Sequence, residues 1–463
     1  MTKLNSSISR RDFSRSLALG LAGAATGGFG LHAAQAAPGD ANPFRSQAEW
    51  AQNYDADARL AVPRSETPLL SVQTSNATEQ AIQRYRQLVS QGGWQPVPAA
   101  QTLKVGSRGN NVLALRRRLI VTSDLTEQAG NSPVFDSYVE AAVRRFQVRH
   151  GISPTGVVAK ETFAALNVPA QERLRQLEIN LVRLRAFSGN LGDRHVTMNI
   201  PAAAVETVEN GQIVTHHIAG VGKIDRQSPV MQARALDINF NPFWTVPASI
   251  IRKDLIPKTQ KDPNYLTENR IRIINRAGQE IPPSQVNWNS MEATNYMFRQ
   301  DPGGDVNSLG FVRINIANPH GVYMHDTPAK GIFGDDYRFV SSGCVRVQNV
   351  RDFVAWLLKG SGDGNWTRDR IDEVIRSGQR VDVRIATPVN VYWVYVTAWA
   401  DRDVVHFRED IYRRDGFSAG SVATNNQAPT IQPVSGSPED MAPPAGSARR
   451  GPVPAAPVGT NFR

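Results

Sequence analysis

The period of the hydrophobic pattern changes near residue 190, and this change sets the fold class of the chain. Up to that point apolar residues recur every three or four positions, as the leucines of residues 171–187 do, which is typical of amphipathic helices. Beyond it Val196, Met198 and Ile200 alternate with polar residues, which is typical of a half-buried strand. The sequence therefore predicts an α+β protein, helical in its first part and mostly β in its second.

The helical part contains a module of three short helices. Within residues 102–168, apolar side chains recur at helical spacing in two stretches, and the second lies between Asp136, an N-cap residue, and Gly151, which ends the helix. A third helix is expected at 160–166. A unit of this size is suited to binding, and the helix at 171–190 is expected to connect it to the β-rich region.

The β-rich region is interrupted by a long segment without a period. Short strand candidates precede residue 249 and follow residue 310, whereas the residues between them are polar and rich in Asn, Pro and charged side chains. Long patternless segments in compact domains tend to be lids or binding loops, so we expect an ordered cap.

These patterns divide the whole chain into segments. We expect a leader at 1–36, a linker or a packing region at 37–101, the helical module at 102–168 and the connector helix at 171–190. The β-rich domain is expected at 194–416, with its cap at 249–310. Residues 417–463 are rich in Pro, Ala, Ser and Gly and are expected to be a disordered tail.

The first 36 residues read as a twin-arginine (Tat) signal peptide. Arg10 and Arg11 precede an uncharged stretch, and Ala34-Gln35-Ala36 has the small-x-small form of a cleavage site. The alternative is a membrane anchor, but the glycines make the stretch weakly apolar, and a stable span needs about 20 strongly apolar residues. We therefore expect export to the periplasm and no stable membrane insertion after cleavage.

The charge of the chain favours an anionic partner. The formal net charge is +10, and the leader carries four basic residues and one acidic residue, so its removal leaves +7. An exported protein rarely meets nucleic acid, which is therefore not expected as a partner, whereas anionic envelope polymers are adjacent. The single cysteine excludes a disulfide framework and a thiolate zinc cluster.

That cysteine lies in the stretch that carries the chemistry. Cys344 follows Gly343 in a polar turn, with His325 upstream and Arg346 downstream. An imidazole in hydrogen-bond reach can take the proton of a thiol, and a cation can lower its pKa. We therefore expect more thiolate at neutral pH than a free thiol with a pKa near 8.5 would show. Gly343 allows a turn in which the N–H groups of residues 343 and 344 point at one spot, as an oxyanion hole requires.

Two other interpretations of these residues stay open at this point. A lone cysteine is often a small buried hydrophobe, and His325 and Arg346 could each be purely structural. A zinc site formed by His320, His325, Asp326 and Cys344 is conceivable, but no paired ligand spacing supports it, so no metal and no cofactor are expected.

The stretch from His325 to Arg346 resembles the L,D-transpeptidases with a YkuD-type catalytic domain. Their signature is a histidine followed within about twenty residues by Ser-x-Gly-Cys-x-Arg, which Ser341, Gly343, Cys344 and Arg346 reproduce. Residues 102–168 resemble the three-helix peptidoglycan-binding domain, and the whole resemblance covers about residues 70–415. Further stretches similar to the large Gram-negative subgroup are 221–223, 226–231, 241–247 and 407–412.

The resemblance implies an enzyme of peptidoglycan biosynthesis that contributes to cell wall organisation and cell shape. Its cysteine would attack a tetrapeptide stem, expel D-alanine and form a thioester, which an amine of a neighbouring stem resolves into a 3-3 crosslink. Carbapenem-type inhibitors are implied as further ligands. By position, the nucleophile would be Cys344 and the base would be His325. The oxyanion would be held, or the imidazole oriented, by Gly343, Tyr323 and Asp326. Substrate would be bound by Arg346, Ser341, Ser342 and Trp244.

The same residues are compatible with two other functions. Water could replace the acceptor amine, which would make the protein an L,D-carboxypeptidase. A protein without catalysis could use its helical module and its charge to anchor itself to peptidoglycan. The sequence leaves the acyl acceptor, the oligomeric state and the group that orients His325 undecided.

Tat-dependent export is the first testable prediction. Because the Tat route reads the arginine pair and general secretion does not, replacing Arg10 and Arg11 by Lys should leave the protein in the cytoplasm. Cell fractionation followed by immunoblotting measures this. Normal amounts of the doubly substituted protein in the periplasm would show that the Tat assignment is wrong.

Overall fold

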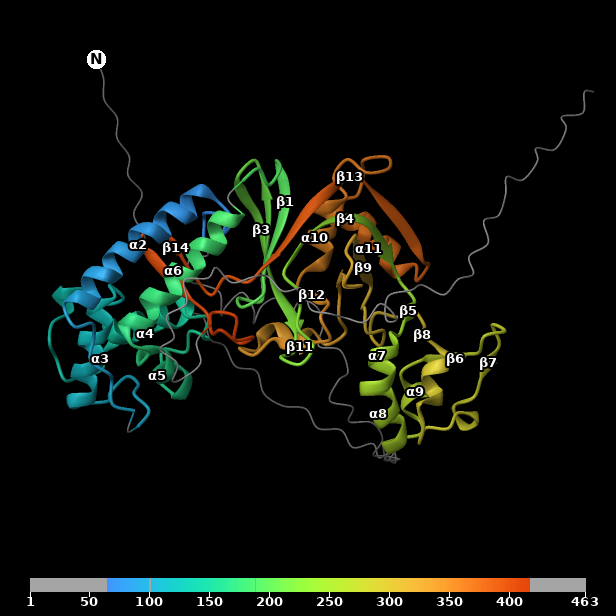
Figure 1. Ribbon diagram of the computed structural model, residues 1–463, viewed down its shortest axis with the longest axis horizontal. Coiled ribbons are helices and arrows are strands. Elements are labelled where there is room, and N and C mark those ends of the chain that lie inside the picture. Colours follow the sequence, from blue (N-terminus) through green and yellow to red (C-terminus); the bar gives the residue numbers. More distant parts are fainter. Residues whose placement is uncertain (1–64, 100, 188, 417–463) are drawn as a thin grey trace, which may run out of the picture. The chain divides into compact units, whose positions relative to one another are not determined.

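The computed structural model describes residues 65–99, 101–187 and 189–416 (Figure 1). The predicted signal peptide, 1–36, and the predicted tail, 417–463, lie outside these residues and stay predictions. The described helices of the N-terminal part are α2 (Val72–Ser90), α3 (Asn110–Val121), η1 (Glu127–Ala129), α4 (Ser137–Arg149), α5 (Lys160–Leu166) and α6 (Ala170–Ala186).

The helical module has a hydrophobic core of its own. Side chains from α3, α4 and α5, among them Leu115, Phe146 and Leu166, are fully buried together. Asp136 caps α4 by accepting a hydrogen bond from the Val139 N–H at 3.0 Å, as the sequence predicts. Before the module, α2 begins at Val72, where the Ser71 hydroxyl caps it by accepting from the Thr74 N–H.

The second part of the chain is built on a sheet that closes on itself. Its strand order is β11-β3-β12-β10-β9-β4-β13-β1-β2, and β2 also pairs with β3. Most neighbours are antiparallel, but β1 with β13, β10 with β12 and β11 with β3 are parallel. The strands are β1 (Arg194–Asn199), β2 (Ala204–Glu209), β3 (Gln212–Gly222), β4 (Met231–Phe240), β9 (Val312–Ile316), β10 (Met324–His325), β11 (Phe339–Ser341), β12 (Val345–Val347) and β13 (Val381–Val394).

One hydrophobic core joins this sheet to two helices. The helices α10 (Val350–Leu357) and α11 (Arg368–Arg376) bury Phe353 and Ile371 against the inner strand residues. The strand β13 runs unbroken from Val381 to Val394, because its pairing register with β4 shifts between Arg384 and Val389 and so accommodates Pro388. The short helix η5 (Lys330–Gly334) precedes β11. After β13 the chain forms an antiparallel hairpin of β14 (Ala398–Asp401) and β15 (Val404–Phe407).

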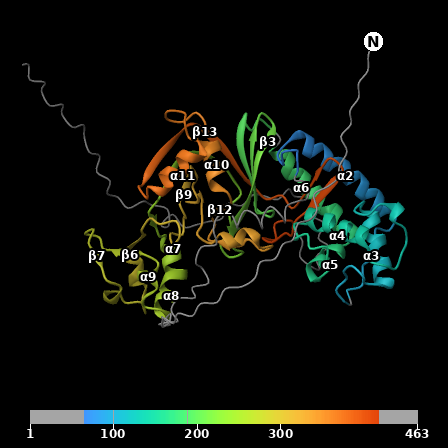
Figure 2. The same cartoon turned by 180° about the vertical axis from the view of Figure 1, so that it is seen from behind.

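Residues 244–310 have a small sheet and a hydrophobic cluster of their own. The sheet order is β5-β8-β6-β7, and Leu266 and Phe298 are fully buried in the cluster. The hydrophobic period is lost here because every element is short. The elements are β5 (Trp244–Thr245), α7 (Ala248–Ile250), η2 (Ile251–Leu255), α8 (Ile256–Lys261), α9 (Tyr265–Glu268), β6 (Ile271–Ile274), β7 (Glu280–Ile281), η3 (Pro283–Gln285), η4 (Met291–Asn295) and β8 (Met297–Gln300). We call this unit the cap (Figure 2).

The helices α2 and α6 pack on each other and on the β14–β15 hairpin. Leu177 of α6 and Phe407 of β15 are buried in one cluster with Ala81 of α2. The Asn180 side chain donates to the Thr397 hydroxyl at 2.7 Å and accepts from the Thr397 N–H. Within the described residues, no helix combines the length and the apolar character that a membrane crossing requires.

Buried histidines predict a loss of stability in mild acid. Burial lowers the pKa of His150 and His195, and burial also lowers the pKa of His406 to about 3. Below about pH 6.5 the unfolded chain binds protons that the folded chain excludes, so the free energy of unfolding should fall between pH 7 and pH 5. Urea denaturation at a series of pH values measures this. His406→Gln should reduce the slope, and a parent protein whose stability is constant over this range would contradict the prediction.

Candidate active site

Two short parallel strands bring the predicted catalytic residues onto one face. In the register of β10 and β12, Met324 lies opposite Val345 and His325 lies opposite Arg346. Met324 and Val345 are fully buried in the main core. Because side chains alternate along a strand, the residues on either side of these two point to the opposite face. Tyr323, His325, Cys344 and Arg346 therefore share that face, on strands about 5 Å apart.

The His325 imidazole is held by a backbone carbonyl. Its Nδ1 lies 2.5 Å from the Asp326 carbonyl oxygen, so Nδ1 carries the proton and Nε2 keeps its lone pair. The side chain is 5% exposed. Burial, with Arg346 as the second cause, lowers the pKa of His325 to about 3. The imidazole is thus neutral at physiological pH and has its basic nitrogen available.

Asp326 contributes through its backbone, while its carboxylate has a separate role. The carboxylate forms an ion pair with Lys330 and accepts a hydrogen bond from the Phe311 N–H at 3.0 Å. A Cβ on Gly310, where φ is +60°, would lie within 2.6 Å of the Asp326 side chain. The Asp326 carboxylate therefore fixes the turn before β9. The group that orients the His325 imidazole, which the sequence left undecided, is the Asp326 carbonyl.

The Cys344 thiol is protonated in the resting site. The residue is partly exposed, yet burial raises the pKa of its thiol to about 11, against the opposing effects of Tyr323, Arg313 and Arg346. The expectation of extra thiolate at neutral pH is therefore wrong, because desolvation outweighs the cations nearby. The structure gives a neutral thiol beside a neutral imidazole, which is the starting point for general-base catalysis.

Tyr323 stands on the same face as the thiol. Its hydroxyl accepts a hydrogen bond from the Trp244 indole N–H at 3.1 Å, and its own O–H can still donate. Burial raises the pKa of Tyr323, with Cys344 as the next cause, so the hydroxyl keeps that proton. Trp244 was expected to bind substrate, but it is 8% exposed and lies in the cap cluster. The structure makes it a positioning residue for Tyr323 instead.

The turn that carries Cys344 is braced from inside. The Ser341 hydroxyl donates to the Cys344 carbonyl at 2.6 Å and accepts from the Gly343 N–H at 3.1 Å. The Gly343 N–H, expected as an oxyanion donor, is thus used within the turn, and Ser341, expected as a substrate contact, is buried. The roles of both residues in catalysis stay predictions. Among the described residues none accepts from the Cys344 N–H, which leaves that amide as the available backbone donor.

A second layer of hydrogen bonds supports this turn, and sequence reasoning missed it. The Ser228 hydroxyl donates to the Gly343 carbonyl at 2.8 Å and accepts from the Gly222 N–H. The Tyr412 hydroxyl accepts from the Ser228 N–H and donates to the Gly222 carbonyl. Both residues lie in the stretches that carry the family resemblance, so the signal was present without an assigned role.

Arginines surround the site without acidic partners of their own. Arg313 lies opposite His325 in the β9–β10 register, and its guanidinium carbon is 4.3 Å from the centroid of the Tyr323 ring. Neither Arg313 nor Arg346 forms an ion pair with a carboxylate of the described residues. Sequence reasoning missed Arg313, although it stands on the site face of a strand. Unneutralised cations here favour an anionic substrate.

The cap contacts the catalytic turn through Arg226. Its guanidinium donates to the Ser342 hydroxyl at 3.0 Å and pairs with Asp254 of η2 at 2.5 Å. Ser342 is exposed, so it keeps the position expected of a substrate contact. Within residues 65–416, apart from the two positions left out, no three His, Cys, Asp or Glu side chains form a group that could hold a metal ion.

Comparisons with known proteins identify the two domains. Residues 193–391 match the L,D-transpeptidase catalytic domain, YkuD, and residues 108–166 match the "Putative peptidoglycan binding domain". The resemblance to the L,D-transpeptidase catalytic domain thus holds over residues 193–391, and the resemblance to the peptidoglycan-binding domain holds over residues 108–166. The resemblance and the α+β fold class predicted from the sequence are confirmed.

Individual relatives are more distant. A "Putative L,D-transpeptidase" of Haemophilus influenzae is 31% identical over 243 residues, which are 52% of this chain and 48% of that protein, so the match spans about half of each. An L,D-transpeptidase structure from Xylanimonas cellulosilytica covers 65% of this chain and 100% of that chain at 16% identity and a TM-score of 0.22. An L,D-transpeptidase in complex with imipenem covers 44% of this chain and 59% of that chain at 14% identity and a TM-score of 0.22.

The neutral resting pair predicts how the thiol reacts with pH. Because the pKa of Cys344 is raised to about 11, iodoacetamide should alkylate it more slowly at pH 7 than it alkylates free cysteine. The rate should then rise about tenfold per pH unit up to pH 9, past the point where a free thiol levels off. Mass spectrometry of quenched samples gives the rate, with Cys344→Ala as the blank. Faster alkylation than free cysteine at pH 7, or a plateau below pH 8, would contradict the neutral pair.

Proposed function

We propose that this chain is a periplasmic L,D-transpeptidase that forms 3-3 crosslinks between peptidoglycan stem peptides. One observation carries the proposal: the parallel register of β10 and β12 puts a thiol, an oriented imidazole and a phenolic donor on one face. The catalytic domain family and the peptidoglycan-binding domain support the class of substrate.

The first half of the reaction acylates Cys344. As Sγ attacks the carbonyl carbon of the scissile amide, Nε2 of His325 takes the thiol proton. The developing oxyanion lies near the Cys344 N–H, which has no acceptor, and the Tyr323 hydroxyl. When the C–N bond breaks, Nε2 gives its proton to the departing amine of D-alanine. The thioester and a neutral imidazole remain.

The second half transfers the acyl group. An amine of diaminopimelate on a second stem attacks the thioester carbon, and Nε2 accepts the proton that the amine loses. The tetrahedral intermediate collapses, and Nε2 returns the proton to the thiolate that leaves. Water in place of the amine gives the L,D-carboxypeptidase reaction, with the same residues in the same roles.

Burial of His325 and Cys344 keeps the ground state neutral while the transition state develops charge. An imidazolium and an oxyanion are formed within a site whose nearby charged groups include Arg313 and Arg346. The oxyanion is stabilised by these groups, and the carboxylates of both stems provide natural partners for the two arginines. Arg346 and Ser342 are therefore proposed as substrate contacts, and Arg313 is added to them.

A cysteine that accepts an acyl group from an amide should also accept one from a strained lactam. We therefore propose carbapenems as covalent inhibitors, with Cys344 as the acylated residue. The reaction as written uses no metal and no cofactor. Export by the Tat pathway places the enzyme beside its substrate, the periplasmic peptidoglycan, where it would serve cell wall organisation and cell shape.

The roles of Cys344 and His325 are tested together. Cys344→Ala should abolish crosslinking, and Cys344→Ser should nearly do so because a hydroxyl is much harder to deprotonate than a thiol. His325→Ala should keep the fold and slow acylation by about 10² to 10⁴, the usual contribution of a positioned general base. His320→Ala, a histidine outside the shared face, is the matched control and should retain activity. Mass spectrometry of muropeptides, after incubation with tetrapeptide-bearing peptidoglycan, identifies the products.

The products of the same assay separate the alternatives. Crosslinked dimers indicate transpeptidation, tripeptides without dimers indicate carboxypeptidase activity, and neither product indicates an anchoring protein. EDTA should have no effect on turnover. Retention of 3-3 crosslinks by Cys344→Ala would overturn the covalent mechanism, and a loss with EDTA that zinc restores would favour the metal alternative.

Binding of the helical module to the wall should depend on its exposed arginines. Of the four arginines at 108, 116, 117 and 118, Arg116 and Arg118 are buried and donate to backbone carbonyls, so they are structural. Arg108 and Arg117 are exposed. Arg108→Gln with Arg117→Gln should weaken co-sedimentation of the full chain with purified sacculi at low salt.

The matched control for this experiment removes the same charge elsewhere. Arg84→Gln with Arg86→Gln changes two arginines of α2 whose side chains are 44% and 54% exposed. This variant should bind sacculi as the parent does. Equal binding by the parent and by both double variants would show that the module's exposed arginines do not hold the wall polymer.

A further inference from the structure

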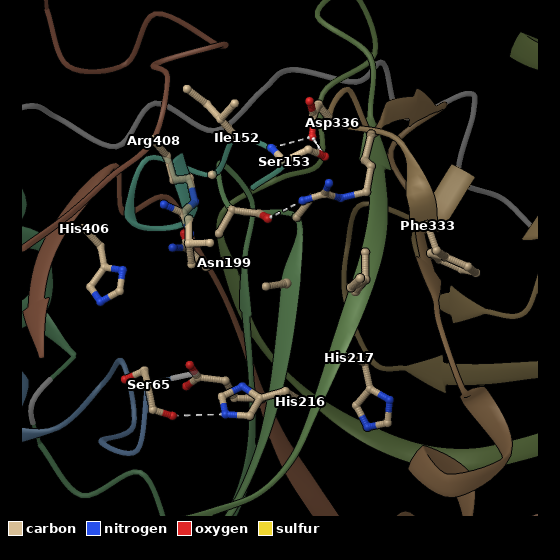
Figure 3. Close-up of a pocket in the computed structure, with 18 of the residues that line it drawn as sticks. Ser65, Ile152, Ser153, Asn199, His216, His217, Phe333, Asp336, His406 and Arg408 are labelled. Carbon is tan, nitrogen blue, oxygen red and sulfur yellow. Dashed lines mark hydrogen bonds between the residues drawn. The ribbon is translucent and has the colours of Figure 1, made fainter. Parts of the chain in front are cut away.

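A cavity of about 250 Å³ lies between the helical module and the closed sheet, separate from the candidate active site (Figure 3). None of Tyr323, His325 and Cys344 lines it. Its walls come from β1, β2 and β3, from residues 148–154 that follow α4, from residues 333–338, and from the β14–β15 hairpin. The proposed reaction assigns no role to this cavity.

The sheet wall carries a row of polar side chains. Thr197 lies opposite Glu206 in the β1–β2 register, and Glu206 lies opposite His216 in the β2–β3 register, so the three form one row on the same face. The Glu206 carboxylate accepts from the Leu69 N–H at 3.0 Å. The Thr197 hydroxyl is buried and has no hydrogen-bond partner among the described residues. Buried polar groups are seldom left in that state without a ligand or a water.

Two arginines line the cavity, and neither forms an ion pair with a carboxylate of residues 65–416 that the structure describes. Arg408 donates to the carbonyls of Arg149 and Phe407, and Arg338 donates to the carbonyls of Asp335 and Ala202, while the Nε of Arg338 has no partner among the described residues. Figure 3 labels Arg408 and Asn199 among the residues that line the cavity.

The electrostatics of the two arginines indicate a site for an anion. Burial and the nearby Arg338 lower the pKa of Arg408 to about 9, as expected for two cations that share too little negative charge. Asp336 and Asp335 both line the cavity and both raise the pKa of Arg338 against the larger, opposite effect of burial. The Oδ1 of Asp336 also accepts hydrogen bonds from the N–H and the hydroxyl of Ser153. The cationic side of the cavity is thus only partly neutralised.

Close packing holds Arg408 in place against the helical module. A Cβ on Gly151, where φ is +70°, would lie 2.8 Å from both Cδ and Nε of Arg408. A glycine is required there both for the backbone conformation and for the contact. The guanidinium therefore has a fixed position at the cavity wall, as a binding group needs.

Apolar side chains form much of the remaining lining, beside polar ones such as Asn199, His217 and His406. Leu69, Ile152, Ala202, Phe333 and Trp399 contribute to the walls. At roughly 30 Å³ per water in the liquid, the cavity holds about eight water molecules, which is the volume of one or two amino-acid residues. A ligand that matches this lining has a carboxylate, a small apolar body and a group that hydrogen-bonds.

We propose that this cavity binds a small α-amino carboxylate, one or two residues in size, with its carboxylate at Arg408 and Arg338 and its polar group toward the Thr197–Glu206–His216 row. Two sources share this chemistry: a free D-amino acid of the kind released by the reaction, and the C-terminus of a stem peptide. Naming these sources rests on the proposed function, whereas the binding chemistry does not.

Three probes test the site in the full chain with Cys344→Ala. D-alanine represents the free amino acid, N-acetyl-D-alanine represents a peptide terminus, and D-alaninamide lacks the carboxylate. Calorimetric titration and saturation-transfer NMR should show saturable binding of D-alanine, of N-acetyl-D-alanine, or of both, and which of them binds tells the source. D-alaninamide should bind at least tenfold more weakly.

Two variants assign that binding to the cavity. Arg408→Gln removes the cation, and Ala204→Leu fills the space while the arginines remain, so each should weaken binding at least tenfold. Arg84→Gln, which removes one charge from α2, should bind as the parent does. Thermal unfolding of every variant identifies any that do not fold, and Ala204→Leu in the chain that retains Cys344 should still be acylated by a carbapenem.

The proposal is overturned by any of three results. These are no saturable binding of either carboxylate, equal binding of D-alaninamide, or unchanged binding in both folded variants, Arg408→Gln and Ala204→Leu. The outcome is independent of the proposed function, because this binding is measured in a protein that lacks the nucleophile. Failure of crosslinking in the muropeptide assay would leave the binding result intact.

Discussion

The candidate site depends on two short parallel strands, each anchored by one buried side chain. Met324 and Val345 lie opposite each other and are inaccessible to solvent, so the strand pair cannot slip by one residue without exposing both. Such a slip would also turn His325 and Cys344 into the core. The hydrophobic core of the sheet thus fixes which face carries the chemistry, and the same register brings Arg346 opposite the histidine.

The surroundings of His325 and Cys344 explain why both side chains are neutral in the resting site. Burial lowers the pKa of His325 to about 3 and raises the pKa of Cys344 to about 11, so both groups are neutral before substrate binds. Arg346 and Arg313 oppose the effect of burial on the thiol but do not cancel it. Charge therefore forms during the reaction, where the Cys344 N–H and the Tyr323 hydroxyl can act on it, rather than in the resting enzyme.

Local sequence revealed the type of site but not its supports. The Ser-x-Gly-Cys-x-Arg stretch and the upstream histidine could be found because they are short and contain the only cysteine of the chain. Ser228 and Tyr412 could not be assigned, because each acts through hydrogen bonds to residues distant in sequence, among them Gly343 and Gly222. The same holds for Trp244, whose contact with Tyr323 depends on how the cap folds.

The fold shows the same division between local and long-range information. Periodicity predicted the helices of the module and the α+β class, because the buried apolar residues of each helix recur every three or four positions within that helix. It did not reveal that β13 is one strand across Pro388, because only pairing with β4 shows the register shift. It likewise gave no account of the cap, where elements of two to six residues are too short to display a period.

In the proposed reaction Cys344 itself carries the acyl group, and the intact mass of the enzyme shows whether it does. Purified full chain is mixed with a soluble disaccharide-tetrapeptide without an acceptor, quenched in acid and weighed by mass spectrometry. We expect an adduct equal to the donor minus D-alanine, located on the peptide that contains Cys344 and absent from Cys344→Ala. Turnover of the donor by Cys344→Ala, or an adduct on any other residue, would contradict a thioester on Cys344.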